Sequence, residues 1–185
     1  MAVGPLRSTL RMHSSNRSIV EQSARVVSDA ACLVSPVVAR GFDIWSAARS
    51  GAGVPPADGL KAEQLQAILP YVYLVDVVGG DGRETADGPP DFRYRLVGTD
   101  VVAHTEADNT GRLLSDIARQ GSQATLIRLY ELAIEQGQPA VQRIPYRSRR
   151  GSRHWYETIV MPMATGPDGR IDRLLGVAEH FCQSV

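Results

Sequence analysis

The chain has 185 residues, of which 43% are hydrophobic and 22% charged, and its formal net charge is zero. This length suits one domain with extensions, and it can bury a core without metal or disulfide staples. The neutral balance gives no support for binding to nucleic acid or an anionic membrane, and no apolar run approaches the roughly 20 residues that span a bilayer.

The first 59 residues are expected to form an extension. Residues 1–16 are polar and basic, which predicts disorder. Residues 17–59 predict two helices and a linker rich in Gly and Pro, with Ser35-Pro36 separating the helices. The second helix has Val38, Phe42 and Trp45 on one side. The first has an apolar stripe at steps of four and three residues, formed by Val20, Ala24, Val27, Ala31 and Val34.

The apolar stripe of the first helix needs a packing partner, because an isolated helix of this length is marginal in water. The protein's own sheet is one alternative. We favour a second subunit, which makes the five stripe residues candidates for a dimer interface. On this hypothesis, Val27→Asp converts a dimer into a monomer and leaves the domain folded.

Residues 60–182 are expected to form the main domain. A short helix ends near Pro70, and strands are predicted over 71–78, 92–97, 140–147, 154–163 and 171–181. Short helices are predicted near 100–104 and 111–118, and a long helix over 122–136 that Gly137 ends. The order predicts an α+β fold, a five-stranded antiparallel sheet with helices on one face.

Short motifs along this domain occur together in a characteristic order. They are Phe42 to Trp45 with Val54-Pro55, residues 69–76, residues 92–99 with Thr110-Gly111-Arg112, and then Tyr156-Glu157, Met161-Pro162 and Leu175-Gly176. Over about residues 42–181 the chain resembles the fifth PAS family, whose members are common in alphaproteobacteria. The resemblance implies the PAS fold and a sensory or interaction module, with no shared catalytic apparatus and no shared ligand. Helices flanking PAS domains commonly mediate dimerisation, which fits the expected homodimer.

The usual cofactors of such a domain can be tested by residue type. A flavin photoreceptor needs a reactive cysteine near the ring, but no cysteine lies between Cys32 and Cys182. Haem is usually held by a histidine of the long helix, and residues 122–136 contain none. We therefore expect no cofactor.

Residues of the types that bind metal ions occur in two places. His104, Glu106 and Asp108 are two residues apart, but in a loop or short helix this spacing does not align them, so a solvated loop is favoured. The last two strands contain His154, Glu157, Glu179 and His180. Strand alternation places the first two on opposite faces, so all four cannot form one site without a bulge. We expect no metal site.

Two further groups are candidate binding residues. Four arginines surround Gly151 at a predicted strand turn and could hold an anion, although a solvated hairpin is the more common situation; they are Arg147, Arg149, Arg150 and Arg153. A ligand cavity between sheet and helices could be lined by apolar and aromatic residues, although aromatics at alternating positions are more often core; these are Tyr94, Leu96, Leu113, Leu126, Tyr130 and Trp155.

Three functions are compatible with these patterns. The first is a sensor whose small-molecule ligand lies between sheet and helices. The second is an adaptor with a filled core that docks partners or a second copy. The third is a small cone-fold enzyme with His154 or His180 as base, but the sequence offers no oriented triad or metal set, so we do not expect an enzyme.

No kinase, cyclase or DNA-binding signature is present, so the effector would be a separate signalling protein. Two distant cysteines without CxxC spacing favour a cytoplasmic location.

Overall fold

The computed structural model describes residues 22–51, 53–79, 90–117, 122–147 and 151–182. The strands are β1 (Gln22–Val26), β2 (Val72–Val78), β3 (Asp91–Val97), β4 (Ala140–Arg147), β5 (Arg153–Ala164) and β6 (Ile171–Cys182). The α-helices are α1 (Pro36–Ala47), α2 (Ala62–Leu65), α3 (Thr99–Thr105) and α4 (Ser122–Gln136), and the 3₁₀ turns are η1 (Ala30–Cys32), η2 (Ala57–Gly59) and η3 (Gln66–Tyr71). All five predicted strands and the long helix are confirmed.

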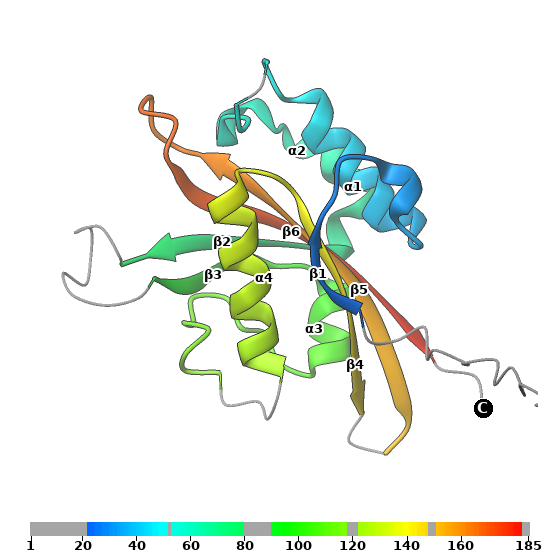
Figure 1. Ribbon diagram of the computed structural model, residues 1–185. Helices are drawn as coiled ribbons and strands as arrows, with labels where there is room; N and C mark the ends of the chain where they lie inside the picture. Colours follow the sequence, from blue (N-terminus) through cyan, green and yellow to red (C-terminus); the bar gives the residue numbers. More distant parts are fainter. Residues whose placement is uncertain (1–21, 52, 80–89, 118–121, 148–150, 183–185) are drawn as a thin grey trace, which may run out of the picture.

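The strands form one antiparallel sheet in the order β1-β4-β5-β6-β2-β3 (Figure 1). The predicted α+β class is confirmed, with a sixth strand, β1, added at the edge beside β4. Long β5 and β6 form the centre, with Tyr156 opposite His180 and Ile159 opposite Val177. Because successive side chains of a strand point to opposite faces, β5 contributes to two separate cores.

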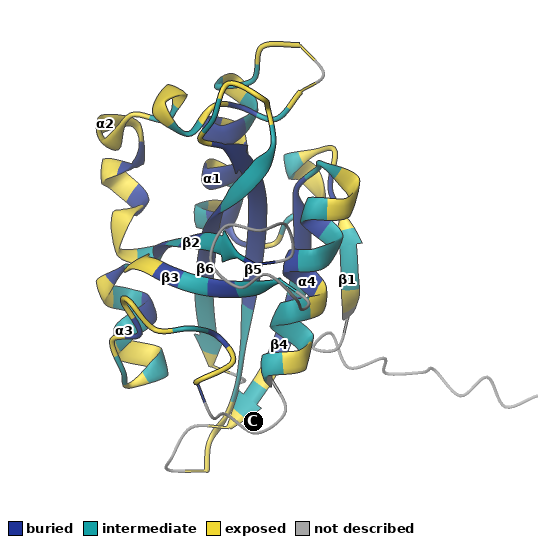
Figure 2. Ribbon diagram, turned by 90° about the vertical axis from the view of Figure 1, so that its left-hand side faces the viewer, coloured by how far each residue is buried: buried dark blue, intermediate teal, exposed yellow. Residues whose placement is uncertain are grey.

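Each face of the sheet is covered by different elements (Figures 1 and 2). On one face, which we call the α1 face, Val38, Trp45, Ile159 and Val177 are among the buried core residues. On the other, the α4 face, the core includes Phe92, Leu129, Tyr130 and Leu174. The expectation of helices on one face therefore holds for α3 and α4, whereas α1 covers the second face.

The predicted helix over the first apolar stripe is wrong. Gln22–Val26 is strand β1, paired with β4, and Val27 N–H continues the contact by donating to Pro139 O at 2.8 Å. Asp29 then caps the turn η1 by accepting from Ala31 N–H, which competes locally with a helix. The edge of the sheet supplies hydrogen-bond partners for the backbone of this segment. Pairing with β4 therefore outweighs the helical spacing of its apolar residues.

The second predicted helix is confirmed as α1. Its N-cap is Ser35, whose hydroxyl accepts from Val38 N–H at 2.9 Å, and Pro36 occupies the first turn. The indole N–H of buried Trp45 donates to Pro162 O at 2.8 Å, which ties α1 to β5. The N-terminal extension thus packs on the protein's own sheet from Val27 to Trp45.

A β-bulge changes the orientation of β3. Leu74 pairs with Leu96 and Val75 with Tyr94, so Arg95 is an extra residue on β3. Beyond the bulge, each side chain of β3 points to the opposite face from the one that unbroken alternation would give it. Val97 packs with the α4-face core, and Leu96 is 37% exposed.

The predicted helix over 111–118 is also wrong in its described part, which ends at Ile117. Leu113 forms an isolated bridge with Arg93, Arg112 O accepts from Tyr94 N–H, and Leu114 N–H donates to Phe92 O. The segment runs alongside β3 because that strand's free edge offers these hydrogen bonds.

Candidate functional site

The space between β2, β3 and α4 is filled by aromatic rings. Phe92 and Tyr130 meet edge to face at 5.0 Å between centroids, and Tyr73 and Tyr94 are tilted at 6.1 Å. The hydroxyls of Tyr94 and Tyr130 hydrogen-bond at 3.2 Å, and that of Tyr73 bonds the hydroxyl of Thr158 at 2.7 Å. Each polar end therefore finds a partner inside the core.

Gly176 makes room for this packing. A Cβ at Gly176 would lie 2.1 Å from two ring carbons of Tyr73, so the ring lies directly over the glycine of β6. Burial, and then the neighbouring Tyr94, raises the pKa of Tyr73 above its ordinary value. Burial, followed by Tyr73 and Tyr94, raises the pKa of Tyr130 well above its ordinary value. The hydroxyls stay neutral and hydrogen-bonded rather than acting as acids.

The six predicted ligand-pocket residues do not form one cavity. Tyr94 and Tyr130 are core residues that contact each other, and Leu126 packs partly buried against the same core. Leu113 is half-buried beside β3. Leu96 points to the other face because of the bulge, and Trp155 lies on the α1 face with Glu157 because strand β5 alternates. The structure does not bring these last two residues together with the other four.

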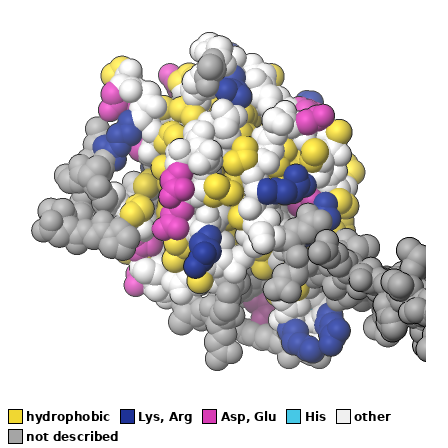
Figure 3. Space-filling view, viewed as in Figure 1, with side chains coloured by type: hydrophobic (Ala, Val, Ile, Leu, Met, Phe, Trp, Pro, Cys, Tyr) yellow, Lys and Arg dark blue, Asp and Glu magenta, His cyan; other side chains and the backbone are white. Residues whose placement is uncertain are grey.

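An open groove lies between β1, β4 and α4, on the side that faces the viewer in Figures 1 and 3. Its volume is about 430 Å³, and it is lined by Ser23, Ala24, Thr125, Arg128, Glu131, Leu132, Glu135 and Gln142. Figure 3 shows basic, acidic and hydrophobic side chains intermingled on this side. The groove therefore carries no charge of a single sign that would select a ligand.

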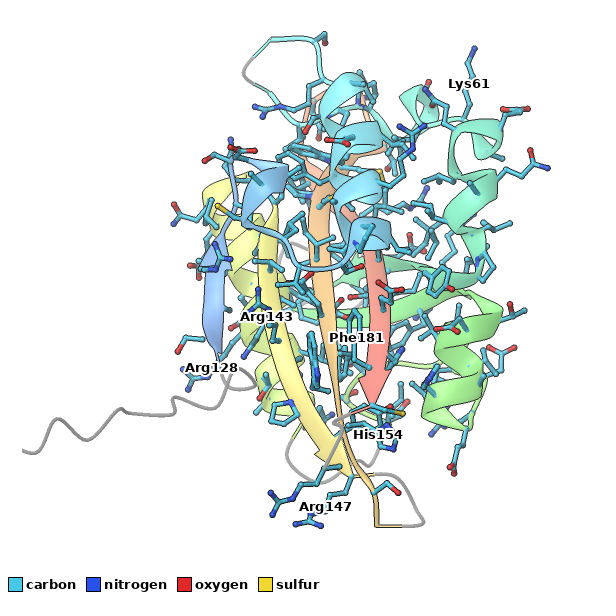
Figure 4. The ribbon with its side chains drawn as sticks, turned by 90° about the vertical axis from the view of Figure 1, so that its right-hand side faces the viewer. Lys61, Arg128, Arg143, Arg147, His154 and Phe181 are labelled. Atoms are coloured by element: carbon cyan, nitrogen blue, oxygen red, sulfur yellow. The ribbon has the colours of Figure 1, made fainter. Side chains whose placement is uncertain are left out.

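An apolar row crosses three strands on the α1 face. Pro145 of β4 pairs with Trp155 of β5, and Trp155 pairs with Phe181 of β6. The Trp155 and Phe181 rings stack at 4.2 Å with an interplanar angle of 16°. Pro145 is exposed and the two rings are half-buried. In Figure 4, α1 crosses the upper part of this face, and Phe181 lies on the lower part, which no helix covers in that view.

A buried carboxylate lies beside this row. Glu157 is fully buried and accepts from the N–H groups of Val34 (2.9 Å) and Ser35 (2.7 Å) and from Nε of Arg143 (3.0 Å). Glu179, opposite it on β6, accepts from the Ser35 hydroxyl. The two glutamates of the final strands thus hold the start of α1, on the face opposite His154 and His180, as alternation predicts.

A cluster of two histidines and one aspartate lies on the α4 face, where α3 meets β6. His104 and His180 stack with centroids 4.1 Å apart and an interplanar angle of 1°. Asp100 Oδ2 lies 3.3 Å from His104 Nδ1 and 3.7 Å from His180 Nδ1. Asp100 and His104 are one turn apart on α3, and β6 supplies His180.

The environment of His180 disfavours its charged form. Its side chain is 5% exposed, and the rings of Tyr146 and Tyr156 pack against it at 5.9 and 5.0 Å. Burial, then the neighbouring His104 and His154, lowers the pKa of His180 to about 3. Among the described residues, neither His180 Nδ1 nor Asp100 Oδ2 has a hydrogen-bond partner, although both atoms are buried.

The sequence pattern did not identify this trio. It grouped His104 with Glu106 and Asp108, and Asp108 instead accepts from Thr110 N–H at 2.9 Å in its own loop. The available signal was Asp100 and His104 at positions i and i+4 of a predicted short helix. Nothing in the sequence placed His180 beside them.

Anion binding by the arginine hairpin and dimerisation through the apolar stripe stay predictions. Arg147 and Arg153 are exposed and directly opposite each other on β4 and β5, while Arg149 and Arg150 lie outside the described residues (Figure 4). Of the stripe, Val20 lies outside the described residues, and the rest share no face: Val27 is buried, Ala24 half-buried, and Ala31 and Val34 exposed. From residue 22 onward the segment forms β1 and η1 in place of the amphipathic helix that motivated the stripe.

Comparisons with known proteins complete the description of the site. A family model described as PAS domain matches residues 33–179, and no curated protein sequence matches the chain. An RNA-binding light-oxygen-voltage receptor is similar in structure, with 19% identity and a TM-score of 0.41; the match covers 69% of this chain and 36% of that one. A fungal light-oxygen-voltage photoreceptor is 15% identical with a TM-score of 0.45, covering 76% of this chain and 90% of that one. The chain thus spans about a third of the length of the RNA-binding receptor.

Proposed function

We propose that this chain, which belongs to the PAS domain family, is a sensory module. The module would signal by docking another protein, and its first docking partner would be a second copy of the same chain. The apolar row Pro145, Trp155 and Phe181 carries this proposal. Trp155 and Phe181 stack on an open part of the sheet, and aromatic residues at such positions often dominate protein–protein binding energies.

The filled interior supports docking over an enclosed ligand. Tyr73, Phe92, Tyr94 and Tyr130 fill the space between the sheet and α4, and the hydroxyls of the three tyrosines are hydrogen-bonded to protein groups. A ligand that entered there would displace buried rings and leave these hydroxyls unpaired, which costs about 1–3 kcal/mol for each group. The ligand-bound sensor is therefore the second alternative.

The chain is proposed to act without a catalytic step and through a separate effector protein. The two glutamates that would accompany His154 and His180 in an acid–base site lie on the opposite face and bind the start of α1. The thiols of Cys32 and Cys182 are both free and exposed, which supports a reducing compartment such as the cytoplasm. No helix in the described part of the chain is long and apolar enough to cross a membrane.

Light scattering of the purified chain at tens of micromolar tests the docking surface. We expect a dimer for the wild type. Trp155→Thr places a β-branched residue, which suits a strand, at this position. It should weaken the dimer by at least about 30-fold, the equivalent of ~2 kcal/mol for a central aromatic residue.

The control is Leu96→Thr, which removes a hydrophobic residue that is 37% exposed from β3. It should leave the dimer intact. A monomeric wild type would overturn the self-docking proposal, and a Trp155→Thr variant that stays dimeric with a native circular dichroism spectrum would place the interface elsewhere. Native mass spectrometry of the same samples would reveal a retained small molecule, which would favour the ligand-bound sensor.

A further inference from the structure

Two members of the trio Asp100, His104 and His180 have unmet bonding capacity, whereas His104 Nδ1 contacts the backbone oxygen of Asp100 at 2.9 Å. Its three ligand atoms, one from each side chain, lie within 4.8 Å of one another. Among the described residues, Asp100 Oδ2 and His180 Nδ1 are buried without a hydrogen-bond partner. Each such group costs about 1–3 kcal/mol relative to a satisfied one, so a ligand that satisfies both at once would be stabilised at this position.

A proton is poorly suited to fill this position. His180 Nδ1 lies 3.7 Å from the carboxylate, which is too long for a hydrogen bond. The His180 side chain is 5% exposed, so a charged imidazolium there would lose most of its solvation. A neutral imidazole offers a lone pair, which is the form that binds metal ions.

We propose that Asp100, His104 and His180 bind one divalent transition-metal ion of the zinc type. Two imidazoles and one carboxylate suit zinc and its first-row neighbours, whereas magnesium and calcium prefer sets made of oxygen alone. Three protein ligands leave a further position for water, and the His104 side chain, 36% exposed, gives access from solvent.

Metal binding requires the His104 ring to turn out of its parallel stack with His180 and away from the Asp100 backbone oxygen, because lone pairs in two parallel ring planes do not converge on one ion. Ligand atoms around a tetrahedral zinc ion lie about 3.3 Å apart, given bonds of about 2.0–2.1 Å, so the trio must contract. His104 is the side chain that can move, because it stands on the surface of α3. His180 is fixed by Tyr146 and Tyr156, which pack against it. The ion would join α3 to β6, a central strand of the sheet.

The site is independent of the proposed docking surface, since His180 and Trp155 lie on opposite faces of the sheet. The experiment therefore measures zinc binding directly. It uses the full chain without an affinity tag, with Cys32 and Cys182 replaced by serine so that thiolates cannot contribute. Zinc is titrated against a chromophoric chelator, and calorimetry gives the stoichiometry. We expect one zinc per chain, micromolar or tighter binding, and a higher melting temperature with zinc.

Two variants test the ligands without removing the most buried one. His104→Ala and Asp100→Asn should each weaken zinc binding by at least about tenfold, because even the loss of an outer partner of a ligand has that effect. His154→Ala is the matched control, a histidine on the same face outside the trio, and it should bind as the parent does. In the parent, zinc should shift the imidazole NMR signals of His104 and His180.

Several outcomes would overturn the assignment. They are the absence of binding at millimolar zinc, unchanged affinity in the His104 and Asp100 variants, or an equal loss in His154→Ala. Zinc binding by the unsubstituted chain that is lost in the chain with both cysteines replaced would show a thiolate site instead. Equal affinity for magnesium would indicate a nonspecific carboxylate site.

Discussion

The carboxylate of Glu157 accepts a hydrogen bond of 2.7 Å from the backbone N–H of Ser35, the N-cap of α1. The two residues are 122 positions apart in the sequence. The same carboxylate holds Arg143 of β4 at 3.0 Å. One buried side chain thus fixes the start of the N-terminal helix to the middle of the sheet.

Glu157→Gln should lower the free energy of unfolding by about 3 kcal/mol, because it leaves the buried Arg143 guanidinium without its counter-charge. Urea denaturation monitored by circular dichroism measures this. Glu135→Gln, at an exposed position of α4, should change stability by less than about 0.5 kcal/mol. Equal effects of the two substitutions would mean that the buried pair contributes nothing.

Val27→Asp should abolish folding rather than convert a dimer into a folded monomer. Val27 is 2% exposed and packs in the α1-face core, where an unpaired carboxylate is costly. The milder Val27→Ala should cost about 2 kcal/mol, and Val34→Ala, 52% exposed, close to nothing. A folded, monomeric Val27→Asp protein would instead restore the original interface hypothesis.

The tyrosine cluster makes the protein sensitive to alkaline pH. The folded-state pKa values of Tyr73 and Tyr130 are raised above those of the unfolded chain. The stability from these residues is therefore fully present below about pH 10 and decreases above it, because the unfolded state then releases protons that the folded state retains.

Absorbance of tyrosinate against pH provides the measurement. Of the six tyrosines, Tyr73 and Tyr130 should ionise only as the protein unfolds, and this late component should shrink in Tyr73→Phe. A titration in which all six ionise before any loss of circular dichroism would contradict the cluster.

Gly176→Ala should destabilise the domain by about 3 kcal/mol, since its Cβ would overlap the ring of Tyr73. A double-mutant cycle by urea denaturation identifies the cause. In a Tyr73→Ala background the ring is gone, so adding Gly176→Ala should cost much less than it does alone. Additive effects would show that the glycine matters for another reason.

The sequence alone was sufficient for the elements that local rules specify. The period-two pattern and flanking turn residues predicted β2 to β6, Gly137 marked the end of α4, and Ser35-Pro36 marked the start of α1. Alternation along β5 also separated His154 from Glu157 correctly. These features depend on spacings of a few residues, which the chain itself displays.

Only the tertiary structure decided the remainder. Residues 20–34 have a helical spacing of apolar residues, but a free sheet edge beside β4 makes residues 22–26 a strand. The extra residue Arg95 turns Leu96 away from the core. Asp100 and His180 lie 80 positions apart, and they meet because β6 passes under α3. Pairing partners, bulges and contacts between distant segments depend on the complete packed chain, so no local pattern could specify them.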